Sequence, residues 1–207
     1  MALHRIKILL AMMFSIALLC YGANVISNPG FETAGGGGAD VFANWTEGTA
    51  GTSSVNDETG DVHGDSHACR LDIDASNNSA SLYNTCALSI GETYKLSIWY
   101  KNSEAAKTMR FYLYNNMSNI WLKDDSTWAS GVPTAVTLPN STSWTEYTIT
   151  FTVSSYTDYV LNMNNNSAAS SSIYIDDVDL DTFHPHNTVL KSGLTVILGS
   201  GVKLIFK

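Results

Sequence analysis

The sequence predicts an all-β protein, a β-sandwich jelly roll of two antiparallel sheets with a C-terminal β-hairpin tail. Short alternating runs rich in Tyr, Thr, Val, Ile and Trp recur along the chain, and clusters of Gly, Asn, Ser and Asp separate them. No amphipathic helical pattern follows residue 23. A chain of 207 residues can form one domain with a full hydrophobic core.

The strand signals are clearest in eight segments, in which β-branched and aromatic residues alternate with polar ones. These segments are Ala68–Asp74, Ser81–Leu88, Thr93–Lys101, Thr108–Tyr114, Thr134–Leu138, Trp144–Val153, Tyr159–Asn164 and Ser172–Leu180. Shorter strands are expected near Val25, Val41 and Ser53.

The first 23 residues have the layout of a secretory signal peptide. Arg5 and Lys7 precede the apolar run Ile8–Cys20, and the small residues Gly22 and Ala23 follow it. The run is short for a membrane span, although an uncleaved anchor helix is the alternative. We therefore expect a secreted protein, extracellular or at the cell surface, with no membrane association after cleavage.

The charge of the chain argues against a nucleic-acid partner. The formal net charge is −8, and loss of the signal peptide would make it −10 because two basic residues and no acidic residue leave with it. Binding of phosphates requires clustered Lys and Arg. Only 14% of the residues are charged, which suits a secreted β-protein better than a cytosolic helical enzyme.

Beyond the signal peptide, the composition divides the chain into three parts. They are a jelly-roll domain over residues 24–181, a linker over residues 182–189 and an apolar hairpin over residues 190–207. In the hairpin, the apolar runs Leu194–Leu198 and Val202–Phe206 flank a Gly-Ser-Gly turn. An isolated hairpin is only marginally stable in water. The tail is therefore expected to dock on the domain or to mediate self-association, unless it begins a further domain.

Two cysteines remain after the signal peptide, and they are expected to form a disulfide. Pairing of Ala68–Asp74 with Ser81–Leu88 as a hairpin would place Cys69 opposite Cys86. A bridge over such a short loop contributes on the order of 3 kcal/mol in the chain-entropy model.

Six motifs, taken in their order and spacing, give the chain a resemblance to a known family. They are Asn28-Pro-Gly-Phe-Glu32, Trp45, Val62-His-Gly-Asp-Ser-His-Ala68, Gly91-Glu-Thr-Tyr-Lys-Leu-Ser-Ile-Trp-Tyr100, Trp144-Thr-Glu-Tyr147 and Tyr174-Ile-Asp-Asp-Val178. Over residues 24–180 the chain resembles the jelly-roll carbohydrate-binding modules attached to bacterial xylanases, cellulases and laminarinases. The resemblance implies a jelly roll that binds polysaccharide.

The resemblance also implies a structural calcium ion. Carried over, its side-chain ligands would be Glu32 and Asp176, with Asp177 the less favoured choice and backbone carbonyls completing the set. Calcium prefers hard oxygen ligands, and carboxylates that meet at a sheet edge would otherwise repel one another. The alternative is that these acids cap turns without a metal.

Strand alternation predicts a ligand-binding face if the strands share one sheet. One side of the strands would be core, and the other would collect Trp99, Tyr112, Tyr114, Arg110, Arg70, Asp72, Asn162 and Asn164. Aromatic rings can cover the apolar faces of sugars while polar side chains bind their hydroxyls. The alternative is an ordinary solvated sheet face with a Trp covered by a loop.

The sequence does not favour catalysis. A glycosidase needs two carboxyl groups that flank the scissile bond. The acidic pairs Asp124-Asp125 and Asp176-Asp177 are adjacent residues, and neighbours on a strand are expected to point to opposite faces.

The residues and the family resemblance together predict a non-catalytic, secreted carbohydrate-binding domain that holds polysaccharide or surface glycan on a concave sheet face. The alternative is a structural or adhesive surface subunit that uses the same jelly roll without a sugar ligand. A small glycoside hydrolase is the third, least favoured hypothesis.

Overall fold

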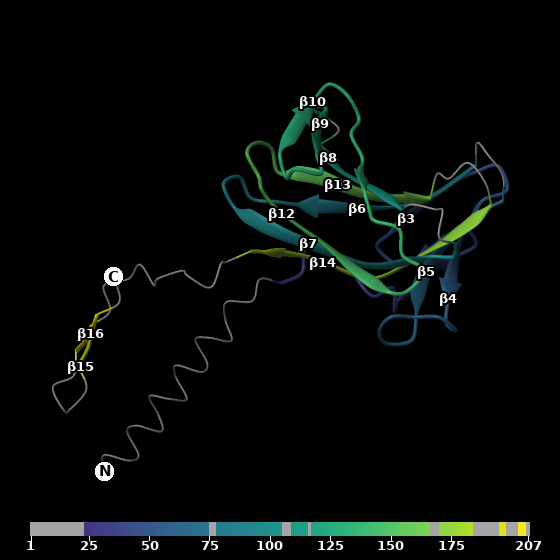
Figure 1. Cartoon of the computed structure of the whole chain (residues 1–207), viewed down its shortest axis with the longest axis horizontal. Helices are drawn as coiled ribbons and strands as arrows, with labels where there is room; N and C mark the ends of the chain where they lie inside the picture. Colours follow the sequence, from purple (N-terminus) through teal and green to yellow (C-terminus); the bar gives the residue numbers. More distant parts are fainter. Residues whose placement is uncertain are drawn as a thin grey trace, which may run out of the picture.

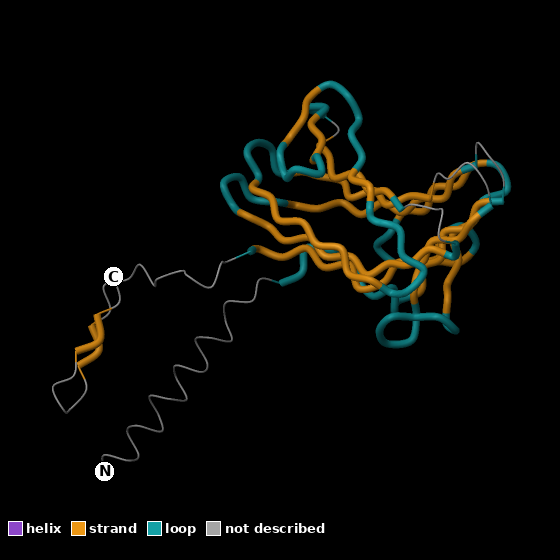
Figure 2. Tube along the Cα trace, in the orientation of Figure 1, coloured by secondary structure: helices purple, strands orange, loops and turns teal. Residues whose placement is uncertain are grey.

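The computed structural model describes residues 23–74, 78–104, 109–115, 117–165 and 170–183, together with the backbone of two short strands near the C-terminus. Two antiparallel sheets stack face to face and form the domain (Figure 1). Every regular element in the described ranges is a strand, and the tube in Figure 2 shows the two layers. Within those ranges, no helix of the length and apolarity needed to cross a membrane is found.

The seven-stranded sheet contains the central strands that carry the candidate site. In spatial order its strands are β10 (Trp128–Ser130), β9 (Ile120–Leu122), β8 (Arg110–Asn115), β13 (Asp158–Asn165), β6 (Ser79–Ala87) and β3 (Thr46–Ala50), and β11 (Val136–Thr137) also pairs with β8. Neighbouring strands are antiparallel throughout.

The five-stranded sheet forms the other layer. Its order is β12 (Thr145–Thr152), β7 (Thr93–Asn102), β14 (Ser171–Thr182), β5 (Ala68–Ile73) and β4 (Ser54–Glu58). A small hairpin joins β1 (Ala34–Gly37) to β2 (Asp40–Phe42).

The core lies between the two sheets and is built from alternate residues of each strand. Leu96 and Ile98 of β7 face it from one sheet, and Phe111, Leu113 and Leu161 face it from the other, all fully buried. Full burial of each such side chain contributes about 1.5–3 kcal/mol relative to exposure. The predicted β-sandwich of two antiparallel sheets is therefore confirmed.

All eight segments with clear strand signals contain strands. Of the shorter expected strands, Val41 lies in β2 and Ser53 directly precedes β4. Val25 lies outside the strands, although its backbone N–H donates to the Leu180 carbonyl over 2.9 Å. The strands β1, β3, β9 and β10 were not expected, because they are short or rich in glycine.

The predicted disulfide is wrong. Cys69 lies in β5 and Cys86 in β6, and these strands belong to different sheets. The chain crosses from one layer to the other between them, so the expected hairpin does not form. Both cysteines are buried free thiols, and desolvation raises the pKa of Cys86 to about 12 and that of Cys69 well above its usual range.

The predicted C-terminal hairpin is present as an antiparallel pair. β15 (Thr195–Ile197) pairs with β16 (Lys203–Ile205), with Val196 opposite Leu204. The strand β14 continues to Thr182, where the Phe183 N–H donates to the Thr93 carbonyl over 2.7 Å. The predicted signal peptide, apart from Ala23, and most of the predicted linker lie outside the described residues.

Candidate functional site

The outer face of the seven-stranded sheet is lined mainly by aromatic, asparagine and hydroxyl side chains from β6, β13, β8 and β9. We call it the tyrosine face, and define it by Ser81, Tyr83, Thr85, Arg110, Tyr112, Tyr114, Trp121, Val160, Asn162 and Asn164. These positions alternate with the buried core residues of the same strands. The sheet therefore fixes their spacing.

The strand register arranges the tyrosine face in three rows that cross the strands. In the middle row, Asn162 of β13 lies between Tyr83 of β6 and Tyr112 of β8. In the row on one side, Asn164 lies between Ser81 and Arg110. The row on the other side runs Thr85, Val160, Tyr114 and Trp121.

Trp121 builds an aromatic corner at one edge of this face. Its ring stacks on Tyr114 with centroids 4.4 Å apart and packs edge-on against Tyr112 at 5.8 Å. The indole N–H donates to Asn119 Oδ1 over 3.1 Å. Aromatic pairs in these arrangements add to the stability gained from burial alone, so the corner holds the ring of Tyr112 in place.

A glycine makes room for the tyrosine at the opposite edge. A Cβ on Gly48 of β3 would lie 2.7 Å from Ser81 Oγ and 3.0 Å from Cε2 of Tyr83. The first distance would force the Ser81 hydroxyl to move, and the second is tighter than nine in ten contacts of real Cβ atoms. Gly48 therefore allows the ring of Tyr83 to lie against the edge strand, and Ser81 Oγ donates to the Gly48 carbonyl over 3.1 Å.

The two asparagines of the tyrosine face carry acceptors without partners. Oδ1 of Asn162 and Oδ1 of Asn164 are buried, and neither accepts a hydrogen bond from the described residues. Buried polar atoms in folded proteins are almost always hydrogen-bonded, and an unmet acceptor destabilises. A ligand rich in hydroxyl groups could supply the missing donors.

The structure divides the predicted binding residues between two opposite surfaces. Arg110, Tyr112, Tyr114, Asn162 and Asn164 lie together on the tyrosine face. The remaining predicted residues are Trp99, Arg70 and Asp72, which lie on β7 and β5 of the five-stranded sheet. The expectation that all these strands share one sheet is wrong, because alternation identifies the side that faces the core but not the sheet to which a strand belongs.

Five side chains of the tyrosine face were missed in the sequence, namely Ser81, Tyr83, Thr85, Trp121 and Val160. Tyr83 and Ser81 alternate with buried Leu82 in a predicted strand, so this signal was available. Trp121 lies in a strand of three residues, which is too short to give a pattern.

On the opposite surface, Trp99 is covered by a loop. The ring of His63 stacks on it with centroids 3.6 Å apart and an interplanar angle of 14°. His63 Nδ1 lies 2.7 Å from Asp177 Oδ2, which holds the imidazole over the indole. The alternative reading of Trp99, a sheet tryptophan under a loop, is the one that the structure shows.

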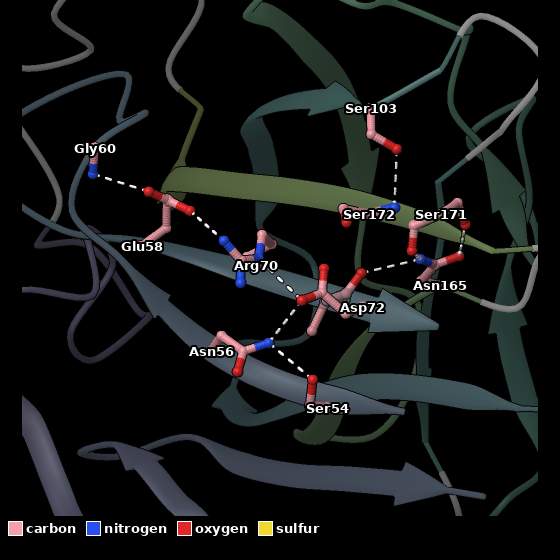
Figure 3. A network of polar contacts seen from close by, with 11 residues as sticks. Ser54, Asn56, Glu58, Gly60, Arg70, Asp72, Ser103, Asn165, Ser171 and Ser172 are labelled. Atoms are coloured by element: carbon pink, nitrogen blue, oxygen red, sulfur yellow. Dashed lines mark hydrogen bonds and ion pairs between the residues drawn. The ribbon is translucent and has the colours of Figure 1, made fainter. Parts of the chain in front are cut away.

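Arg70 and Asp72 neutralise one another on that same surface. Arg70 Nε donates to Asp72 Oδ2 over 3.0 Å, and its Nη1 donates to Glu58 Oε2 over 2.6 Å (Figure 3). Asn56 Nδ2 donates to the same Asp72 oxygen over 2.9 Å. Lys101 is likewise paired with Asp61 and lies 4.4 Å from the centroid of the Tyr174 ring. Both cations are thus paired with carboxylates, whereas Oδ1 of Asp72 is buried and accepts no hydrogen bond from the described residues.

Glu32, Asp176 and Asp177, the residues considered for calcium, all lie near Gly30. A Cβ at this position would lie 3.5 Å from an oxygen of Asp177, 3.9 Å from an oxygen of Asp176 and 3.9 Å from Cγ of Glu32. Both Glu32 and Asp176 accept backbone N–H groups from residues 63–67, the loop that covers Trp99.

A β-bulge brings the two adjacent aspartates to the same side. The pairing of β14 with β7 shifts register between Asp176 and Asp179, and Asp177 has a φ of 44°. The expectation that Asp176 and Asp177 point to opposite faces is therefore wrong, since it assumed a regular strand. Asp176 is 1% exposed. Desolvation, with a further contribution from the charge of Asp177, raises the pKa of Asp176 to about 6.

The chemistry of these residues suits a calcium ion. A buried carboxylate beside a second carboxylate gains from a hard cation. Among the described residues, no group of three or more His, Cys, Asp or Glu side chains is arranged so that it could hold a metal ion. Backbone carbonyls would therefore have to complete the ligand set.

Comparison with known families decides what kind of domain this is. The family model described as "Carbohydrate binding domain" matches residues 23–170. The chain belongs to this carbohydrate-binding domain family. The family and the fold predicted from the sequence motifs are thus confirmed.

Solved structures share the fold of this carbohydrate-binding domain. A family 61 carbohydrate-binding module in complex with β-1,4-galactotriose has a TM-score of 0.57 at 18% identity, over 78% of this chain and 99% of that one. A putative sugar binding protein from Bacteroides thetaiotaomicron has a TM-score of 0.53 at 17% identity, over 78% and 100%.

A third structure with a similar fold is part of a larger protein. The enzymatically active domain of tailspike protein 4 from bacteriophage CBA120 matches with a TM-score of 0.56 at 18% identity, over 77% of this chain. The match covers 21% of the tailspike chain. At these identities the likenesses establish the fold alone. No curated protein sequence matches the chain.

Proposed function

We propose that the protein is a secreted, non-catalytic carbohydrate-binding domain that holds polysaccharide or surface glycan on the tyrosine face. The observation that carries the proposal is the middle row, in which Asn162 lies between Tyr83 and Tyr112. Tyrosine rings can pack on the apolar faces of sugar rings while the amide oxygen between them accepts a hydroxyl hydrogen bond.

The strand spacing of the sheet sets the length of the middle row. The three strands of the middle row are spaced about 4.8 Å apart, so the row spans about 10 Å. A glycan that crosses the strands along this row would meet Tyr112, Asn162, Tyr83 and then Thr46 of the edge strand β3. Beyond Thr46 lies a hollow of about 590 Å³ lined by Trp45, Glu47 and the β1–β2 hairpin.

The distribution of carboxylates supports a binding role rather than hydrolysis. Along the outward positions of β6, β8 and β13, the only carboxylate belongs to Asp158, at one end of β13. Glycoside hydrolysis needs two carboxyl groups placed about the same bond. Asp124 and Asp125 instead accept hydrogen bonds from the backbone N–H groups of Thr137 and Thr127.

A glycan array probed with the wild type, Tyr112→Ala and Trp99→Ala tests this function. Tyr112→Ala removes a ring of the tyrosine face and should weaken binding by about tenfold or more, the range expected for a buried aromatic contact. Trp99→Ala is the matched control, because it removes an aromatic ring from the opposite surface and should leave affinity unchanged. A folded wild type that binds no glycan, or the reverse ranking of the two variants, would contradict the proposal.

We further propose that a structural calcium ion is held by Glu32 and Asp176, with backbone carbonyls. When bound, the ion would supply positive charge that offsets the repulsion among the carboxylates around Gly30. Because the same carboxylates hold the backbone of residues 63–67, the ion would also stabilise the loop over Trp99. It has no catalytic part in this proposal.

A further inference from the structure

Arg110 differs from the other Arg and Lys side chains of the described residues. Arg70 pairs with Glu58 and Asp72, Lys95 with Glu146, Lys101 with Asp61 and Lys123 with Asp125. Arg110 makes no ion pair and no side-chain hydrogen bond to any described residue. In a chain with 19 acidic and 11 basic residues, a cation without a carboxylate partner is unexpected.

The immediate neighbours of Arg110 across the sheet are hydroxyl and amide residues. It is exposed, and the residues that flank it across the sheet are Thr137 of β11 and Asn164 of β13. The row continues to Ser81. Asp158, the one carboxylate at the outward positions of the central strands, is six residues from Asn164 along β13, or about 20 Å away. Beyond Thr137 lies Asp124, whose Oδ1 accepts the backbone N–H of Thr137 over 3.3 Å but forms no ion pair with Arg110.

Arg110 also lies within reach of the proposed sugar row. It precedes Tyr112 by two residues on β8, so the two side chains leave the same face about 7 Å apart. Beside Arg110, Oδ1 of Asn164 is buried and has no donor among the described residues. The planar guanidinium can donate two parallel hydrogen bonds to one carboxylate.

We infer that the glycan bound by the tyrosine face is acidic, and that Arg110 binds the carboxylate of a uronic acid unit whose ring packs on Tyr112. This inference rests on the proposed function and names the class of its ligand. Asn164 accepts a hydroxyl hydrogen bond from the same or the next sugar. Arg110 thus gives the face a preference for carboxylated over neutral glycans.

The test uses uronate polymers, each compared with its own carboxyl-reduced form. Polygalacturonate, alginate and glucuronoxylan are measured by affinity electrophoresis or calorimetry before and after reduction of the carboxylates to neutral alcohols. The wild type should bind at least one native polymer about tenfold more tightly than its reduced form, the range expected for a charge-assisted hydrogen bond. The ring structure of the polymer is the same in both, so the difference reports on the carboxylate.

Arg110→Gln should bring the affinity for the native polymer down to that for the reduced form, while binding to the reduced form persists. Persisting binding shows that the variant is folded. Lys95→Gln is the matched control, because it removes a cation from the other sheet and should keep the preference. Tyr112→Ala should weaken binding to both forms.

Equal wild-type affinity for native and reduced polymers, or an unchanged preference in Arg110→Gln, would overturn the inference and leave the proposed function intact. Binding of sulfated glycans without binding of carboxylated ones would overturn it as well. Failure of the folded wild type to bind any polymer of the panel or any neutral glycan of the array would overturn the proposed function together with the inference.

Discussion

Asp176 is a buried carboxyl group whose charge depends strongly on its surroundings. Its pKa in the folded protein is about 6, raised from 3.8 chiefly by desolvation. Because the folded-state pKa lies above the unfolded value, this group stabilises the folded protein fully below about pH 4, and that stabilisation is lost as the pH rises through about 6. The loss amounts to about 3 kcal/mol across this interval.

The stability of the chelated protein should therefore fall between pH 4.5 and pH 7 as Asp176 ionises. Calcium bound to the ionised carboxylates should offset this loss, since a ligand that binds only the folded state stabilises it. Melting temperatures measured at both pH values, with chelator and with calcium, give the comparison. We expect a larger calcium-induced rise at pH 7 than at pH 4.5.

Glu32→Ala provides the control for this measurement, because it removes one proposed ligand and should abolish the calcium response at both pH values. Because the melting temperatures with and without calcium are compared at the same pH, the titration of unrelated groups does not affect the difference. Identical pH profiles in calcium and in chelator would show that the carboxylates around Gly30 do not hold the ion.

At the scale of the elements, β5 and β6 show what the sequence could and could not predict. Alternation in β5 correctly placed Leu71 and Ile73 in the core, because a pattern with a period of two is a local property. The partner of a strand is a long-range property. The short connection from β5 to β6 suggested a hairpin, yet β5 pairs with β14 and β4, and β6 pairs with β13 and β3.

The same difference between local and long-range properties explains which residues of the candidate site were predicted correctly. The outward residues of β8 and β13 were predicted correctly as neighbours, because these strands pair directly. Trp99 was assigned to the same face because its own strand alternates in the same way. Nothing in the local pattern shows that the loop of residues 59–67 folds over it.

The placement of β5 and β6 in separate layers predicts two unreactive thiols. Cys69 is 0% exposed and Cys86 is 2% exposed, and desolvation raises the pKa of both, so neither should react with a thiol reagent in the native protein. Both should react after unfolding in denaturant without any reductant. The measurement is a thiol titration of protein lacking residues 1–23.

Cys86→Ala should reduce the titre of the unfolded protein from two thiols to one. A titre of zero in the unreduced, unfolded wild type would show a disulfide and would contradict the separation of the two cysteines between sheets.

At the scale of the whole molecule, the C-terminal hairpin is the part whose role the jelly roll does not explain. A chain that ends at Phe183 keeps all of β14 and its backbone hydrogen bond to Thr93. If residues 184–207 link subunits, this shortened protein should become monomeric and keep its melting temperature. If they dock on their own domain, it should stay monomeric and melt earlier, since each buried aliphatic side chain contributes about 1.5–3 kcal/mol.

Light scattering and thermal melting of the protein with residues 184–207 and of the shortened protein separate these outcomes. Assembly through the tail would favour a structural or adhesive role beside sugar binding. An unchanged molecular mass and melting temperature would show that the tail contributes to neither.

The backbone hydrogen bond of 2.9 Å between Val25 and Leu180 has a practical consequence for protein engineering. It places the first and last segments of the jelly roll side by side, although they are far apart in the sequence. A domain whose ends are neighbours can be inserted into a surface loop of a host protein without forcing that loop apart, and it tolerates circular permutation. The jelly roll could thus be inserted as a domain into a loop of an unrelated protein, which would then present the tyrosine face.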